Sequence, residues 1–246
     1  MTRILVLQPH AFSEPAIAAP RPAFESDIDA TYRAVGGAWS AAGGFVDAAL
    51  EDLAVFEAGR HAAEEGFDAV CVDALDDGGA NALRSMLALP VLATGKTVAL
   101  HALTLGGRFA LIAGTRERAV RAAAAQRQWG IERHCAALRT AEPDAPHALR
   151  ATLWECLDQG AEVLCFDSGA LSTAARKIAP DFPLALLDPV EVTVRLAQAL
   201  VAVSLSHSRT ASPAPLVPKL AVIEAMARQA VSQATPWTRP SVPARD

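Results

Sequence analysis

Two stretches of the sequence end in side chains that could transfer protons or bind a small molecule. Residues 66–74 (GFDAVCVDA) align without a gap on residues 160–168 (GAEVLCFDS). Each stretch opens with Gly, has an acidic third residue, continues as an apolar run that includes Cys, and ends in Asp and a small residue. Since apolar runs of this length are typical of buried strands, the match predicts two similar α/β halves. If the halves face each other, the two ends meet at one shared cleft.

The aspartates that close the two stretches, Asp73 and Asp167, are the first candidates for catalysis. A carboxyl group removed from water has a raised pKa and can act as an acid or a base. Asp76 and Asp77 follow shortly after the first of them. The alternative is structural, since Asp at a strand end commonly caps the following helix. Each Asp also precedes the small residue by one position, which can turn its side chain away from the cleft.

Ser168 offers a second chemistry, that of a nucleophile. It stands at a predicted strand-to-helix turn before Gly169, where backbone N–H groups can stabilise an oxyanion. With His10 from the end of the first strand, and with Asp73 or Asp167 orienting the pair, Ser168 would form a hydrolase-like or lyase-like site. The alternative is that Ser168 binds a substrate carboxylate or caps its helix, and that His10 is a polar loop residue.

Three turns could bind a ligand through backbone N–H groups, which suit a carboxylate or a ureido group. The first of these turns is acidic, so it opposes a strongly anionic ligand and favours a neutral or zwitterionic ring. Lys96 could add a cationic contact or could lie in solvent. The predicted substrate-binding residues are Ala74, Asp77, Gly78, Gly79, Thr115, Gly169 and Asp188.

The cysteines and histidines do not form a metal-binding pattern. No CxxC pair occurs, so neither a zinc site nor a disulfide framework is predicted. Cys71 and Cys165 lie three residues before the strand tips and on the other face, so we interpret them as buried small side chains. Cys135 and Cys156 stand in Ala/Leu-rich segments that favour helix. No His pair has metal-ligand spacing beside a carboxylate, and no metal is predicted.

Short apolar runs alternate with longer Ala/Leu-rich segments along the chain. This alternation predicts βαβ units and parallel sheet with helices on both faces, and such sheets bind ligands beyond the carboxyl ends of their strands. Residues 9–22 contain four prolines and predict a loop over the cleft, and residues 140–146 predict a polar linker. The predicted strands are 4–7, 69–72, 109–112 and 163–166, and the predicted helices are 48–65, 80–87, 116–129, 148–159, 170–178, 190–203 and 219–233.

Composition narrows the class of protein. The 246 residues are 52% hydrophobic and 20% charged, which is enough for a core, and the net charge of −5 argues against a nucleic-acid partner. No apolar run reaches the ~18 residues of a membrane span, and the first residues lack a signal-peptide pattern. We therefore predict a cytoplasmic protein with no membrane partner. A mean hydropathy of +0.22 and the Ala-rich helices predict a homo-oligomer.

Several motifs, in their order and spacing, resemble the aspartate/glutamate/hydantoin racemase superfamily, and most closely its hydantoin and allantoin racemase branch. The resemblance covers most of residues 2–215. The motifs that carry it are residues 3–10, 66–79, 89–91, 99–102, 107–109, 134–138, 160–171, 188–190 and 208–209.

The resemblance implies a cofactor-independent enzyme of two lobes, in which one cysteine from each lobe acts as acid or base on a carbon next to a carbonyl. This chain departs from the pattern, because Ala74 and Ser168 stand at the two cysteine positions and Gln8-Pro9-His10 replaces an Asn-Pro-Asn loop. A methyl group cannot transfer a proton. An unaided hydroxyl is so weakly acidic that it does not ionise near neutral pH, so it cannot serve as the base. The thiol mechanism is therefore excluded at these positions.

The predicted fold class is α/β, with two pseudo-symmetric lobes, each a parallel sheet flanked by helices, and a ligand cleft between them. Residues 1–95 and 190–215 form lobe one, residues 96–189 form lobe two, and residues 216–246 form a C-terminal helix and frayed tail.

The leading functional hypothesis is a racemase or isomerase for a small amino-acid-like or hydantoin-like compound that uses acid and base groups other than cysteine and needs no cofactor. Its catalytic candidates are Asp73, Asp167, Ser168 and His10. The alternatives are a Ser168/His10 hydrolase or lyase on a related substrate, and a catalytically silent protein that binds a small molecule. Most of this hypothesis rests on analogy with other proteins of the same fold.

Overall fold

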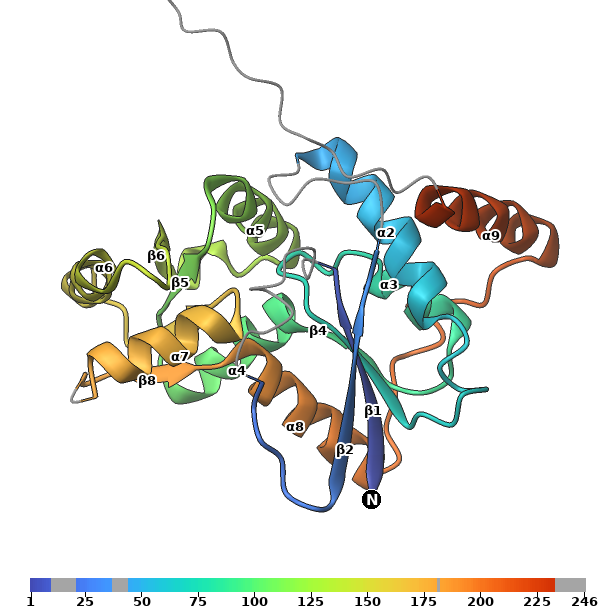
Figure 1. Cartoon of the computed structure of the whole chain (residues 1–246), viewed down its shortest axis with the longest axis horizontal. Coiled ribbons are helices and arrows are strands. Elements are labelled where there is room, and N and C mark those ends of the chain that lie inside the picture. Colours follow the sequence, from blue (N-terminus) through green and yellow to red (C-terminus); the bar gives the residue numbers. More distant parts are fainter. Residues whose placement is uncertain (10–20, 37–43, 181, 233–246) are drawn as a thin grey trace, which may run out of the picture.

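The computed structural model describes residues 1–9, 21–36, 44–180 and 182–232. These residues form two four-stranded sheets with strand orders β2-β1-β3-β4 and β6-β5-β7-β8, and every strand pairing is parallel. Helices flank both sheets (Figure 1). The predicted α/β class, with two lobes of parallel sheet, is confirmed.

The first sheet contains β3, the strand of the first matched stretch, whose tip is Asp73 and Ala74. Helices α2 and α3 cover one of its faces, α8 covers the other, and α9 packs outside against α2. The elements are β1 (Thr2–Gln8), β2 (Ile28–Ala34), β3 (Ala69–Val72), β4 (Val91–Ala93), α2 (Phe45–Gly59), α3 (Ala80–Met86), α8 (Pro189–Ala202) and α9 (Val217–Ser232).

The second sheet repeats this plan. Helices α4 and α5 cover one face, and α6 and α7 cover the other. The elements are β5 (Phe109–Ala113), β6 (Cys135–Thr140), β7 (Val163–Phe166), β8 (Ala185–Leu187), α4 (Thr94–Leu105), α5 (Arg116–Trp129), the short 3-10 helix η1 (Glu132–His134), α6 (Pro146–Asp158) and α7 (Gly169–Ile178).

Alternation along β3 and β7 decides which way each tip aspartate faces. Cys71 packs on the α8 face of the first sheet and Cys165 on the α4/α5 face of the second, both fully buried as predicted. Asp73 and Asp167 extend these strands, since their N–H groups still donate to carbonyls of β1 and β5. Two residues beyond each cysteine, they therefore continue on the same faces.

Helices α4 and α8 connect the two sheets. Helix α4 begins directly after β4 of the first sheet and packs on β7 of the second, whereas α8 follows β8 of the second sheet and packs on β1 and β3 of the first. The first of these helices starts so close to the β3 tip that a Cβ on Gly95 would lie 2.1 Å from the carbonyl oxygen of Leu75. Because α4 also packs on β7, this helix ties the end of β3 to the second sheet.

Three sequence interpretations needed correction. Cys135 was predicted on a helix and Thr140 in a linker, but both belong to β6, which pairs with β5 at the edge of the second sheet. The segment CAALRT has few β-branched residues, so pairing rather than intrinsic propensity makes it a strand. The helix predicted to reach Glu65 ends at Gly59, and the chain turns until Gly66, whose φ is 81°. Within the described residues, no helix is long and apolar enough to span a membrane.

Candidate active site

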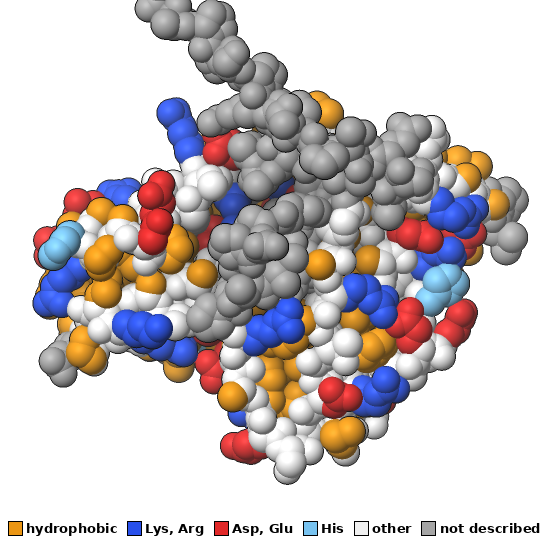
Figure 2. All heavy atoms as spheres, viewed as in Figure 1, with side chains coloured by type: hydrophobic (Ala, Val, Ile, Leu, Met, Phe, Trp, Pro, Cys, Tyr) orange, Lys and Arg blue, Asp and Glu red, His pale blue; other side chains and the backbone are white. Residues whose placement is uncertain are grey.

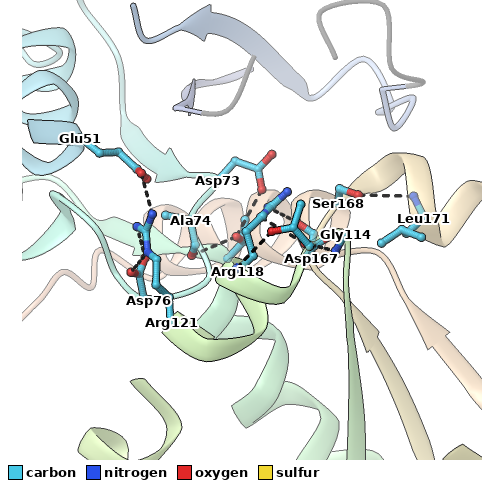
Figure 3. A network of polar contacts seen from close by, with 12 residues as sticks. Glu51, Asp73, Ala74, Asp76, Gly114, Arg118, Arg121, Asp167, Ser168 and Leu171 are labelled. Atoms are coloured by element: carbon cyan, nitrogen blue, oxygen red, sulfur yellow. Dashed lines mark hydrogen bonds and ion pairs between the residues drawn. The ribbon is translucent and has the colours of Figure 1, made fainter. Parts of the chain in front are cut away.

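Asp73 lies at the junction of the two sheets, at the end of β3 (Figure 3). Its side chain is half-buried, and its Oδ1 accepts a 3.3 Å hydrogen bond from Oγ1 of Thr94, the first residue of α4. Burial raises the pKa of Asp73 to about 7, the nearby Arg118 guanidinium lowers it, and the carboxylates of Asp188 and Asp167 raise it further. A carboxyl group with this pKa is present at neutral pH both with and without its proton.

Asp167, the matched residue of the second sheet, has a different environment. It is fully buried, and its Oδ2 accepts a 2.6 Å hydrogen bond from the N–H of Gly114. Arg118 donates from Nη2 to the Asp167 carbonyl at 3.1 Å, and its Nε lies 3.1 Å from Oδ2 without being aligned to donate. Asp167 therefore holds the Arg118 guanidinium in place next to Asp73.

Ser168 and Thr115 begin the two helices that point at this junction. The Ser168 Oγ accepts a 3.4 Å hydrogen bond from the N–H of Leu171 and caps α7, whose first residue is Gly169. The Thr115 Oγ1 caps α5 in the same way, accepting from the N–H of Arg118 at 3.2 Å. Ser168 is half-buried, and its hydroxyl proton is not used by the cap. Both hydroxyls thus have at least a structural role.

Ala74 packs inward. Only 1% of its surface is exposed, and its methyl group belongs to the hydrophobic cluster under α2 and α3. Its carbonyl oxygen accepts from the Thr94 Oγ1 at 3.3 Å and from the Gly95 N–H at 3.1 Å. The Ala74 side chain therefore faces other side chains, on the opposite face from Asp73.

The turn after β3 uses most of its polar groups within lobe one. Asp77 adopts a φ of 60° and pairs with the Arg84 Nη1 at 3.0 Å. The Gly79 N–H donates to Asp52 Oδ1 on α2 at 2.7 Å. Gly79 has a φ of 69°, and a Cβ there would lie 2.5 Å from Val55. The turn therefore packs on α2. Gly78 lies in this turn, between Asp77 and Gly79.

Asp188 and Tyr32 complete the surroundings of Asp73. Asp188 is buried, caps α8 through the N–H groups of Val190 and Glu191, and accepts a short hydrogen bond from Ser172 of α7. Burial raises the pKa of Tyr32 to about 12, and among the charges that act on it Arg21 lowers this pKa while Asp188 and Asp73 raise it. The buried Tyr32 hydroxyl has no hydrogen-bond partner within the described residues.

Sequence reasoning missed Arg118, Thr94 and Tyr32. An arginine in the first turn of a polar helix is usually solvated, and the threonine follows a three-residue strand that gives little signal. Tyr32 is the only tyrosine of the chain, but its strand was not predicted. His10 lies outside the described residues, so the Ser168/His10 pair stays a prediction. Among the described residues, no group of three His, Cys, Asp or Glu side chains is placed to hold a metal ion.

The raised pKa of Asp73 predicts that stability depends on pH at this residue. The folded state keeps the proton up to about pH 7, whereas the unfolded chain loses it near 3.8. The free energy of unfolding should therefore fall as the pH rises between these values. Asp73→Asn removes this dependence. The unfolding free energy of the variant minus that of wild type should therefore increase by on the order of 2–4 kcal/mol between pH 4 and pH 8. Urea unfolding at pH 4, 6 and 8 measures it, and parallel curves for the two proteins would contradict it.

Known proteins share this architecture. The allantoin racemases from Klebsiella pneumoniae and Pseudomonas fluorescens superimpose with TM-scores of 0.70 and 0.67, at 22% and 21% identity, covering 87% of this chain and 94% and 97% of theirs. The maleate isomerase Iso from Pseudomonas putida S16 is also similar, with a TM-score of 0.57, 13% identity, and coverage of 83% of this chain and 93% of its own. At these identities the likeness establishes the fold. No curated protein sequence matches the chain.

The family model described as Asp/Glu/Hydantoin racemase matches residues 37–197, which include both tips and all the helices that meet at the junction except part of α8. The resemblance read from the motifs is confirmed. Because the match extends over well more than half of the sequence, the chain belongs to the Asp/Glu/hydantoin racemase family.

Proposed function

We propose that this member of the racemase and isomerase superfamily moves a proton at a carbon next to a carbonyl, in a small amino-acid-like or hydantoin-like compound, without a cofactor and without a thiol. The observation that carries the proposal is the Asp73 carboxyl group, with a pKa of about 7, beside the Arg118 guanidinium at the junction of the two sheets. General acid–base catalysis works best when the pKa of the group lies near the working pH.

The chemistry assigns different roles to the two aspartates. Asp73 takes the proton from the carbon, and the electron pair of the broken C–H bond moves toward the carbonyl oxygen. The electron pair then moves back as the carbon takes a proton, from Asp73 on the same face or from water on the opposite face. Arg118, fixed by Asp167, stabilises the negative charge that develops on the oxygen. Ser168, on the other sheet, is the candidate for contact with the opposite side of the substrate.

The charges around Asp73 support a substrate with little net negative charge. The charges that act on the Asp73 carboxyl group are those of two further carboxyl groups, Asp167 and Asp188, and of one guanidinium, Arg118. A dianionic compound would add to the repulsion, whereas a neutral ureide ring or a zwitterion would not. The two allantoin racemases among the similar structures also support cyclic ureides as the first compounds to test.

Exchange in deuterium oxide tests this proposal. We expect the enzyme to remove the C–H proton signal of at least one compound among 5-substituted hydantoins, allantoin, aspartate and glutamate, as followed by proton NMR. Optical rotation of the same samples distinguishes racemisation from exchange with retention. If the protein leaves the C–H signals of all these compounds unchanged at pH 6 to 9, the isomerase proposal fails for this substrate class.

The second candidate is a binding protein without turnover. It is favoured by the buried methyl group of Ala74 and by the use of the Ser168 hydroxyl as a helix cap. Calorimetric binding of a compound from the same panel, with no exchange of its C–H proton, would support this candidate over the enzyme.

A further inference from the structure

Arg121 joins the two lobes through a buried ion cluster. It lies on α5 of the second lobe, but its guanidinium bonds only to side chains of the first lobe among the contacts described. Its Nη1 donates to Glu51 Oε2 on α2 at 2.9 Å, and its Nε and Nη2 donate to the two oxygens of Asp76, after β3, at 2.7 and 3.1 Å (Figure 3). The guanidinium thus makes hydrogen bonds from three nitrogens to two separate elements.

The cluster is shielded from solvent. The side chains of Arg121 and Glu51 are 7% and 2% exposed, and that of Asp76 is 17% exposed. Burial raises the pKa of Glu51, and Arg121 lowers it. The neighbouring Asp52 also faces the cluster, and burial raises its pKa too. Charge-assisted bonds in such a place are short and directional, so the cluster fixes the orientation of α5 against the first lobe.

The same helix carries the arginine that acts on Asp73. Arg118 precedes Arg121 by three residues, a little less than one turn of helix and about 4.5 Å along its axis. Because a helix is stiff over one turn, holding Arg121 against the first lobe also sets the distance between Arg118 and Asp73. Asp167 binds Arg118 from within the second lobe and cannot set this distance by itself.

We propose that Arg121 is a positioning residue: by tying α5 to Glu51 and Asp76 across the lobe junction, it keeps Arg118 within electrostatic reach of Asp73. The cluster itself is a feature of the fold, whereas its effect on catalysis rests on the role of Asp73 in the proposed function. Figure 2 shows one face of the molecule, where charged side chains are spread over the surface; the Arg121 cluster differs from these in its burial.

Arg121→Lys tests the proposal with the positive charge retained. One ammonium group cannot donate in the geometry of the guanidinium to both partners, so α5 should shift and the midpoint of Asp73 ionisation should rise by about 1 pH unit as Arg118 recedes. Exchange at pH 7 should fall by at least about fivefold, and about fivefold of this loss should disappear above pH 9, where Asp73 is ionised in both proteins and only the weaker stabilisation by Arg118 separates them. Loss of structure alone would lower exchange at every pH.

A readout without turnover keeps this inference separate from the proposed function. With carbon-13 aspartate, the Asp73 carboxyl signal is identified by its loss in Asp73→Asn, and its midpoint is followed by NMR from pH 4 to 10. Even if no compound undergoes exchange, this titration still decides the role of Arg121.

The matched control is Arg60→Lys. Arg60 likewise lies between two carboxylates on two helices, bonding to Glu57 on α2 and Glu224 on α9 at 2.8 Å, but these contacts join α9 to α2 and do not reach the second lobe. We expect this substitution to leave the Asp73 midpoint unchanged.

Asp76→Asn provides a second variant, should the lysine variant fail to fold. Removing a negative charge would by itself lower the Asp73 midpoint, whereas loosening of α5 raises it. A rise in Arg121→Lys or Asp76→Asn, but not in Arg60→Lys, supports the proposal. A midpoint that stays the same or falls in both cluster variants, or rises equally in the control, overturns it.

Discussion

Asp73→Asn should lower the rate of proton exchange by about 10²–10⁴-fold, the usual contribution of a general acid–base group. Asn has nearly the same shape but cannot accept the proton, and no thiol stands at either tip to replace the carboxylate. The loss should appear in kcat more than in KM, because the carboxyl group acts on the reacting atom rather than in binding. Exchange rates across a substrate titration in deuterium oxide measure both constants.

Asp68→Asn is the control for this change. Asp68 precedes the same strand at its other end, is exposed, and accepts only from the N–H of Arg3 among the side-chain contacts described. It should retain the wild-type exchange rate. If Asp73→Asn keeps a tenth or more of the wild-type rate, Asp73 is not the group that transfers the proton.

The fold was accessible from sequence because β3 and β7 carry their own signals. The runs AVCV and VLCF are apolar throughout, as strands covered on both faces must be, and each is preceded by a glycine that takes a φ of 81° or 82°. The edge strands β2 and β6 lack such runs, since one side of each is open to solvent. Their residues are mixed in polarity, and pairing with β1 and β5 determines their conformation.

The unequal environments of the two aspartates could not be predicted. The matched segments have the same backbone ending, which suggested equal roles for Asp73 and Asp167. What separates them is the set of partners: Gly114 and Arg118 hold Asp167, whereas Asp73 accepts a hydrogen bond from the Thr94 hydroxyl. These partners come from other strands and helices, so no local pattern reveals them, although the position of both aspartates at the sheet junction follows from the order of the elements.

Arg121→Met should cost about 3–5 kcal/mol of unfolding free energy, because it leaves buried carboxylates without their counter-ion. Glu51, on the buried face of α2 with a side chain only 2% exposed, must either keep a buried negative charge without Arg121 or take up a proton. The added substitution Glu51→Leu should restore a large part of the loss, since an apolar pair can replace a buried ion pair at little cost. Urea unfolding at pH 7 measures all three proteins.

Arg60→Met shows what distinguishes this cluster from an ordinary ion pair. Its partners, Glu57 and Glu224, are 21% and 24% exposed, so water can solvate them when the guanidinium is lost. We therefore expect a loss of only about 1 kcal/mol. If Arg121→Met were no more harmful than Arg60→Met, the lobe junction would not depend on the buried cluster. A larger loss that Glu51→Leu reverses would show that the charge of Glu51, rather than the packing of Arg121, makes the arginine necessary.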